Sequence, residues 1–309
     1  MKIVIFHQPF PMGNYNLNHY IGDILQSKGH EVYLIEQLNG MDYTEEYIQQ
    51  FIDLKPDVLY FEMLDKKTFE VVERIDCKKI LVMASKGILN EAIDIPDYYG
   101  KWFDGILVNS EIIYNLVKQR TDNVEHFQYY LTPIKEKEVI YDSKYDFDCV
   151  FLGQGFHRLS QPEFHRERDT FFTGNPKFNY KVFGNGWPQL SWYGGILPHG
   201  DIGKLYGSAK SGISLIEVDQ RPYKMINNRY SEMGFCKCPI ITFDYDEIDW
   251  FGAEKYMNFV NNIDDVTSIV EKCVNNDDDI LKKVEGLKTF MDNQHEIFLE
   301  KLEGLINGN

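Results

Sequence analysis

The sequence alternates short apolar runs with longer segments of helical periodicity, a pattern typical of a parallel β-sheet covered by helices. In the first half, β-branched and aromatic runs predict strands at 2–6, 31–35, 58–61, 80–83, 105–108 and around 124–128. Helices are expected at 17–28, 44–54, 67–75 and 112–120. In the first of these, Leu17, Ile21, Ile24 and Leu25 recur every three or four residues, and Gly29 follows as a stop signal. This half therefore predicts a Rossmann-like domain built from βα units.

The pattern restarts in the second half of the chain. Residues 131–147 are polar, rich in lysine and glutamate, and contain Pro133, so we interpret them as a linker between domains. Beyond them, strands are predicted at 148–152, 180–183, 211–215, 239–243 and 257–259, and helices at 203–209, 228–235, 263–275 and 279–305. We therefore expect an α/β protein with two Rossmann-like domains, 1–130 and 148–309. The two domains should face each other across a cleft lined by residues that follow the strands.

The charge of the chain limits its partners. The 309 residues include 48 acidic and 32 basic ones, a formal charge of -16, which disfavours bulk binding to nucleic acid or to an anionic membrane. Between residues 149 and 240, however, eleven lysines and arginines stand against seven acids, an excess of +4. This window is where we expect a phosphate group to bind. The alternative is a chance fluctuation on a solvated surface.

The five cysteines, at 77, 149, 236, 238 and 273, favour a reducing compartment, and we expect a cytoplasmic protein. Cys236 and Cys238 resemble half of a metal site, but no second pair of cysteines or histidines stands at a ligand-like spacing. We therefore expect no metal centre. The first apolar run ends at His7, which is too short for a signal peptide or a membrane span.

The first predicted strand of the second domain runs into Gly153-Gln154-Gly155. Glycines let backbone N–H groups approach an anion closely, although an ordinary turn has the same sequence. Arg158, Arg166 and Arg168 follow and offer fixed positive charge.

The next strand ends at Gly184-Asn185-Gly186-Trp187. Open backbone groups beside an aromatic face suit a flat heterocyclic base, and the alternative is a core tryptophan after a tight turn.

Residues 225–234 carry the strongest signal. Asn227 or Asn228 caps a helix whose N-terminal N–H groups and dipole suit a diphosphate. Glu232 lies four residues after Asn228, on the same helix face, where it can accept hydrogen bonds from two ribose hydroxyls. The alternative is an exposed glutamate paired with Arg229.

Four segments together resemble a known family. They are Phe-Leu-Gly-Gln-Gly at 151–155, Val-Phe-Gly-Asn-Gly-Trp at 182–187, Pro-His-Gly-Asp-Ile-Gly-Lys-Leu-Tyr-Gly-Ser-Ala at 198–209, and Asn-Asn-Arg-Tyr-Ser-Glu-Met-Gly at 227–234. Their order resembles GT-B fold glycosyltransferases, nearest to the group related to bacterial spore-maturation proteins (glycosyl transferases group 1). The resemblance covers residues 148–244 by sequence and the N-terminal half by layout.

The resemblance implies that the C-terminal domain holds a nucleotide-diphosphate sugar and that the last helix crosses back to the N-terminal domain. It assigns phosphate contacts to Gly153 and to Arg158 or Arg168. It places the base beside Gly184, Asn185, Gly186 and Trp187. It assigns the ribose to Glu232, together with Asn228 and Arg229.

One position departs from the family. Many retaining members carry a glutamate eight residues before the ribose glutamate, where this chain has Lys224. A lysine there can neutralise the leaving diphosphate but cannot act as an acidic contact, so the stereochemical outcome stays open.

The N-terminal half should supply the acceptor site and a base. His7 and Glu62 follow predicted strands, and either can take a proton from an acceptor hydroxyl; His19, within a helix, is a third candidate. The alternative for each is a polar residue satisfied near a strand end. No Asp-x-Asp sequence ends a strand in the middle of the chain, and Asp244 and Asp246 come nearest. We therefore expect transfer without a metal or any cofactor besides the donor.

Two other classes share parts of the pattern. A nicotinamide dehydrogenase would carry Gly-x-Gly-x-x-Gly after its first strand, where this chain reads His-Gln-Pro-Phe-Pro-Met-Gly. A non-catalytic two-domain sugar- or nucleotide-binding protein would normally be exported, yet no signal peptide is recognisable. The acceptor is left open among a glycan, a protein, a small molecule and a modified base in DNA.

Overall fold

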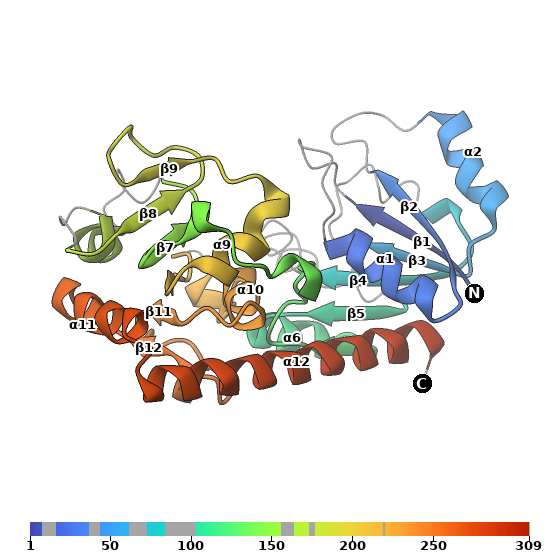
Figure 1. Ribbon diagram of the computed structural model, residues 1–309. Helices are drawn as coiled ribbons and strands as arrows, with labels where there is room; N and C mark the ends of the chain where they lie inside the picture. The colour runs from blue at the N-terminus through green and yellow to red at the C-terminus, as the bar shows by residue number, and fades with distance from the viewer. Residues whose placement is uncertain are drawn as a thin grey trace. The chain divides into compact units, whose positions relative to one another are not determined.

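The computed structural model describes residues 1–7, 17–36, 44–61, 73–83, 103–155, 164–172, 177–218 and 220–308. The chain divides into two compact units. The first unit comprises Met1–Pro133 and Glu296–Asn309, and the second comprises Ile134–His295. Within the described residues, each unit contains one six-stranded sheet whose strands are all parallel (Figure 1). The predicted α/β class with two Rossmann-like halves is confirmed.

The sheet of the first unit has the strand order β2-β1-β3-β4-β5-β6. Its strands are β1 (Lys2–His7), β2 (Glu31–Glu36), β3 (Val58–Phe61), β4 (Lys78–Met83), β5 (Gly105–Val108) and β6 (Val124–His126). Its helices include α1 (Leu17–Ser27), α2 (Glu45–Leu54) and α6 (Glu111–Lys118). Thr44 and Ser110 cap α2 and α6 by accepting hydrogen bonds from Tyr47 N and Ile113 N, each at 3.2 Å. Most of the helix expected at 67–75 lies outside the described residues.

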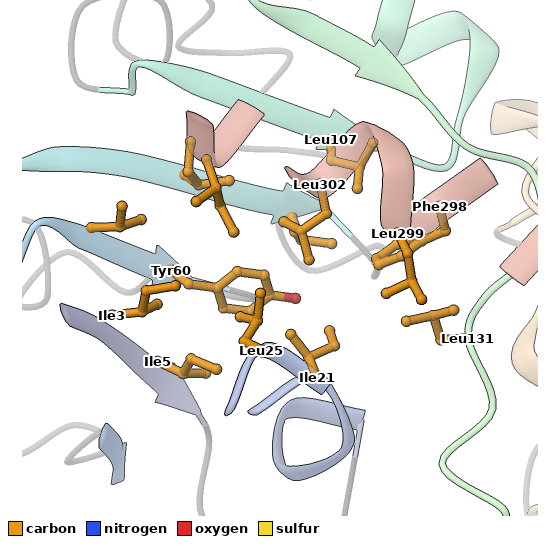
Figure 2. Close-up of a cluster of buried hydrophobic side chains, with 14 of the residues drawn as sticks. Ile3, Ile5, Ile21, Leu25, Tyr60, Leu107, Leu131, Phe298, Leu299 and Leu302 are labelled. Carbon is orange, nitrogen blue, oxygen red and sulfur yellow. The ribbon is translucent and has the colours of Figure 1, made fainter. Parts of the chain in front are cut away.

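The core of the first unit includes residues from the end of the chain. Ile3 and Ile5 of β1 and Tyr60 of β3 are fully buried, as expected for parallel strands covered on both faces. Figure 2 shows Phe298 and Leu302 of the last helix, α12 (Asp278–Asn307), in the same cluster. The N-terminal part of α12 instead packs in the second unit, where Ile280 and Val284 cluster with Cys273. This helix therefore contributes to the cores of both units.

The sheet of the second unit has the order β12-β11-β10-β7-β8-β9. Its strands are β7 (Cys149–Leu152), β8 (Tyr180–Phe183), β9 (Tyr193–Gly195), β10 (Gly212–Ile213), β11 (Ile240–Thr242) and β12 (Asn258–Phe259). Its α-helices include α8 (His165–Glu167), α9 (Ile202–Ser208), α10 (Asn228–Phe235) and α11 (Ile263–Val274), and α12 begins there. Its short helical turns are η1 (Glu136–Glu138), η2 (Ser143–Tyr145), η4 (Arg168–Phe172), η5 (His199–Asp201), η6 (Arg221–Tyr223) and η7 (Glu254–Tyr256).

Part of the expected linker, 131–147, is packed into the second unit. Tyr145 is 2% exposed, and its hydroxyl donates to Asp201 at the start of α9 over 2.6 Å. A Cβ on Gly203 would lie 2.7 Å from the carbonyl oxygen of Glu138, so α9 contacts this segment directly. Residues 134–147 therefore pack along α9 through hydrogen bonds and through apolar side chains such as Ile134 and Val139.

Candidate functional site

The loops that follow β7 and β8 are joined through their glycines. The N–H of Gly153 donates to Phe183 O at 2.9 Å, and the N–H of Gly155 donates to Asn185 O at 2.8 Å. Gly184 has φ +129°, and a Cβ there would lie 2.1 Å from the oxygen of Gly153. We expected the N–H groups of Gly153 and Gly155 to approach an anion. The structure instead uses them to hold the two loops together, so the glycines serve close packing of backbone on backbone.

Trp187 lies beneath these loops with 6% of its surface exposed. Its indole Nε1–H donates to Gly153 O at 2.8 Å, and its ring packs on Phe172 with centroids 4.8 Å apart. A Cβ on Gly155 would come within 2.3 Å of the same ring. The geometry corresponds to the core tryptophan that we named as the alternative. Trp187 therefore fixes the two loops from the core side.

The helix α10 is built as the sequence predicted, and Asn227 is its cap. The side-chain oxygen of Asn227 accepts from Arg229 N at 3.1 Å, and its Nδ2 donates to Leu215 O at 2.6 Å. Asn228 is the first residue of the helix. Because Leu215 follows β10, this pair of bonds anchors the N-terminus of α10 at the carboxyl edge of the sheet.

Glu232 is 3% exposed and lies on the first turns of α10. Its Oε1 accepts from Asn228 Nδ2 at 2.9 Å, and its Oε2 accepts from an Nη of Arg229. The pairing with Arg229 named as an alternative is present, but the glutamate is buried. Burial lowers the pKa of Arg229 and the carboxylate of Glu232 raises it, with a net rise that keeps the guanidinium charged.

Tyr206 of α9 interacts electrostatically with both Arg229 and Glu232. It is 1% exposed, and its hydroxyl has no hydrogen-bond partner within the described part of the chain. Burial raises the pKa of Tyr206 well above its ordinary value; Arg229 opposes this rise and Glu232 adds to it. The phenol is therefore neutral and retains a proton to donate.

A second buried ion pair lies beside the helix and was not predicted. Glu167, 1% exposed, accepts a hydrogen bond from Arg221, a residue of the loop between β10 and α10. The guanidinium of Arg221 lies over the ring of Tyr245 at 4.5 Å. The only signal in the sequence is an arginine in a loop that follows a strand. Its partner, 54 positions earlier, gives no local pattern.

The three arginines that were predicted to offer positive charge to a phosphate have different neighbours. Arg166 lies over the ring of Phe243 at 4.1 Å, and its Nη2 is 3.4 Å from Asn261 Oδ1. Arg168 is half-buried, with Nε 3.5 Å from Asp169 Oδ1. Arg158 lies outside the described residues.

The candidate bases lie in the first unit. His7 is the last residue of β1, and its side chain is outside the described set. Glu62 follows β3 directly but also lies outside the described residues. His19 lies in α1 and is half-buried. Lys224, the departure from the family pattern, follows η6 in the left-handed conformation with φ 54°.

Over the described ranges, no three His, Cys, Asp or Glu side chains are grouped to hold a metal ion. Burial raises the pKa of the Cys236 and Cys238 thiols, which disfavours the thiolate form that binds metals. None of the helices in the described part of the chain is long and apolar enough to cross a membrane.

Comparison with known proteins places this site in a family context. Residues 166–297 match the family described as Glycosyl transferase-like. No curated protein matches the sequence.

Solved structures match over almost the whole chain. An alpha-glucosyltransferase (AGT) in complex with UDP superposes with a TM-score of 0.65 at 10% identity, covering 99% of each chain. T4 phage BGT in complex with UDP-glucose gives 0.57 at 14% identity, covering 97% of this chain and 99% of the other. HepE from Anabaena in complex with UDP-glucose gives 0.57 at 10% identity, covering 99% of each chain. These likenesses establish the fold, and the family match falls on the segment from α8 into α12. The whole chain therefore has the two-domain fold of these glycosyltransferases, and residues 166–297 resemble a glycosyl transferase-like family.

Proposed function

We propose that this protein is a glycosyltransferase that takes its sugar from a nucleoside diphosphate donor held by the second unit and transfers it to a hydroxyl acceptor without a divalent metal. The structures of AGT, BGT and HepE named above contain UDP or UDP-glucose, which favours a uridine nucleotide here. The family match favours this reading over a dehydrogenase or a binding protein. A cytoplasmic setting would keep the five cysteines as free thiols.

The observation that carries the proposal is the buried carboxylate of Glu232 at the start of α10. A carboxylate offers about four lone-pair sites. Asn228 and Arg229 occupy one on each oxygen. Two sites therefore remain, which matches the two hydroxyls of a ribose. The phenol proton of Tyr206 is a further donor that a nearby hydroxyl can use.

The diphosphate is then expected at the N-terminus of α10. Unpaired N–H groups and the helix dipole favour an anion at that end. Arg229 of the first turn and Lys224 of the preceding loop add positive charge. Charges held in place before the reaction stabilise the negative charge that develops on the leaving diphosphate. A divalent metal is not required for this stabilisation.

The first unit supplies the base in this proposal. As the acceptor oxygen bonds to the anomeric carbon, the bond from that carbon to the diphosphate breaks, and the acceptor proton passes to His7 or Glu62. The acceptor is a glycan, a protein, a small molecule or a modified base in DNA. The net charge of -16 disfavours acceptors held by bulk electrostatics.

The proposal is tested by measuring nucleotide-sugar hydrolysis and thermal stability with a panel of uridine, guanosine, adenosine and thymidine diphosphate sugars. A ligand at 100 times its dissociation constant adds about 2.7 kcal/mol to the free energy of unfolding. We expect one nucleotide class to raise the melting temperature of the parent chain and to raise that of Glu232→Ala much less. A panel in which no nucleotide sugar binds or is hydrolysed would refute the proposed function.

A further inference from the structure

The ion pair between Glu167 and Arg221 involves two residues to which the family resemblance assigns no role. Glu167 lies in α8 and is 1% exposed; its Oε1 accepts from Arg221 Nη2, and its Oε2 has no partner among the described residues. A buried charge is costly unless it is paired, and removing one partner costs more than the pair contributes. The pair therefore fixes a geometry more than it adds stability.

That geometry is the orientation of the Arg221 guanidinium. Its Nε and Nη2 both donate to Ile216 O, at 3.3 and 3.2 Å. Its plane lies over the ring of Tyr245, and Glu167 holds one edge. Nη1 donates to no residue that the structure describes, and 20% of the side chain is exposed. The two N–H donors of Nη1 therefore remain for a ligand, on a guanidinium whose Nε and Nη2 are already held.

Two successive carbonyls place this guanidinium beside the N-terminus of α10. Leu215 O accepts from the cap residue Asn227, and Ile216 O accepts from Arg221. Both carbonyls follow β10, and Tyr245 follows β11, the parallel neighbour of β10. Arg221 therefore stands at the carboxyl edge of the sheet, next to the helix end that favours an anion.

We propose that Arg221 is a phosphate ligand of the donor site and that Glu167 is the residue that positions it. This inference rests on the proposed nucleoside diphosphate donor. A planar guanidinium with one edge fixed presents its remaining N–H groups in the direction that phosphate oxygens accept them. Because Glu167 and Arg221 together are formally neutral, the contribution comes from directed hydrogen bonds. Arg221 also differs from Arg158 and Arg168, the phosphate ligands that the family resemblance implies.

The first test compares the binding of UDP and uridine to the full chain by calorimetry. We expect Arg221→Ala to weaken UDP binding about 10- to 100-fold, the range for hydrogen bonds to a charged group, and to leave uridine binding unchanged. Arg221→Lys keeps the positive charge but loses the planar guanidinium that Glu167 and Ile216 hold in place, so we expect an intermediate loss of UDP affinity. The matched control is Arg74→Ala, which breaks an exposed pair with Glu45 in the first unit and should change neither affinity. Unchanged UDP binding, or an equal loss for UDP and uridine, overturns the role of Arg221.

The second test concerns Glu167. Glu167→Gln keeps an oxygen that accepts from Arg221 and should retain UDP affinity within about threefold. Glu167→Ala removes that acceptor, so its loss of UDP affinity should be nearly as large as that of Arg221→Ala. Adding Glu167→Ala to Arg221→Ala should cause no further loss, because the two residues act as a unit. Additive losses overturn the positioning role. If Glu167→Ala fails to fold, Glu167→Met takes its place, because it fills a similar space but accepts no hydrogen bond from Arg221. A loss of affinity for UDP and not for uridine supports the positioning role, and unchanged UDP affinity overturns it.

The outcomes also separate this inference from the proposed function. If the parent chain binds none of UDP, GDP, ADP and TDP, the proposed donor class is wrong and Arg221 has no phosphate to bind. If the parent binds UDP and Arg221→Ala binds it equally well, the donor site stands and only the inference about Arg221 fails.

Discussion

A carboxylate as buried as Glu232, with 3% of its surface exposed, has lost most of its hydration and depends on hydrogen bonds to offset that loss. Asn228 and Arg229 provide one bond to each oxygen. Both donors come from the same helix, so the carboxylate is oriented before any ligand binds. Such preorganisation reduces the ordering cost of binding.

Replacing Glu232 with alanine should therefore weaken the binding of the nucleotide donor by about 1.5–3 kcal/mol, the range for hydrogen bonds to a charged group. Isothermal calorimetry with UDP measures this loss, and Glu232→Gln is the control that keeps the shape. A 2′-deoxy or 3′-deoxy nucleotide should lose less affinity in Glu232→Ala than in the parent, because its missing hydroxyl no longer leaves a carboxylate oxygen unpaired. Equal losses in the two proteins would show that Glu232 does not touch the ribose.

His126, at the end of β6, links stability to pH. Burial lowers the pKa of His126 to about 4; Lys301 lowers it further and Glu111 opposes. In the unfolded chain the imidazole binds a proton near pH 6.5. Between these values the unfolded state holds more protons, so stability is complete above about pH 6.5 and falls as the pH drops toward 4.

Denaturant unfolding at pH 7.0, 6.0 and 5.0 tests this linkage. We expect the free energy of unfolding of the parent to fall across this range and that of His126→Gln to fall less. Identical pH profiles for the two proteins would contradict a half-buried histidine that is neutral in the folded state.

At the scale of elements, the contact between the β7 and β8 loops predicts a contrast between two glycines. Gly184 has φ +129° and a site for Cβ only 2.1 Å from the Gly153 oxygen, whereas Gly195 has φ +91° and nothing within 4 Å of its Cβ site. Gly195→Ala should cost about 1–2 kcal/mol from backbone strain alone. Gly184→Ala should cost about 3 kcal/mol or more, because the two loops must separate.

Chemical denaturation gives both values, and UDP binding should weaken only in Gly184→Ala. If the two alanine variants are equally stable, the loops are not held by the close approach of Gly184 to Gly153.

Most elements were predictable because their signals are local. The strand β3 is a continuous apolar run, and α10 begins where the polar cap Asn227 stands before a periodic segment. The strand β9, Tyr193–Gly195, was missed because Tyr-Gly-Gly has no apolar run; it forms by pairing with β8. The segment containing α8 was likewise assigned no element.

The site was predictable only where its residues lie close in sequence. Asn228, Arg229 and Glu232 share one helix, so their spacing shows their common face. Glu167 and Arg221 meet only in the folded chain. Trp187 follows two glycines whether it faces a ligand or the core, and packing against Phe172 and Gly155 decides for the core.

At the scale of the whole molecule, the donor residues and the candidate bases belong to different units. Glu232 and Arg221 lie in the second unit, whereas His7 and Glu62 belong to the first. The helix α12 packs in both cores, through Val284 in one and Phe298 in the other. Donor affinity and proton transfer should therefore respond to separate sets of substitutions.

The last prediction follows from this division. Replacing the true base, His7 or Glu62, with alanine should lower turnover by a factor of about 10² to 10⁴. Donor affinity should stay nearly the same, because the binding residues are in the other unit. His19→Ala, which removes the third candidate, should keep most of the turnover because His19 lies within α1 and not at a strand end. A chelator should leave transfer unchanged, since arginine, lysine and the helix dipole stabilise the leaving diphosphate. Full turnover in both His7→Ala and Glu62→Ala would remove both residues as the base, and loss of transfer on chelation with recovery on adding metal would refute the metal-free mechanism.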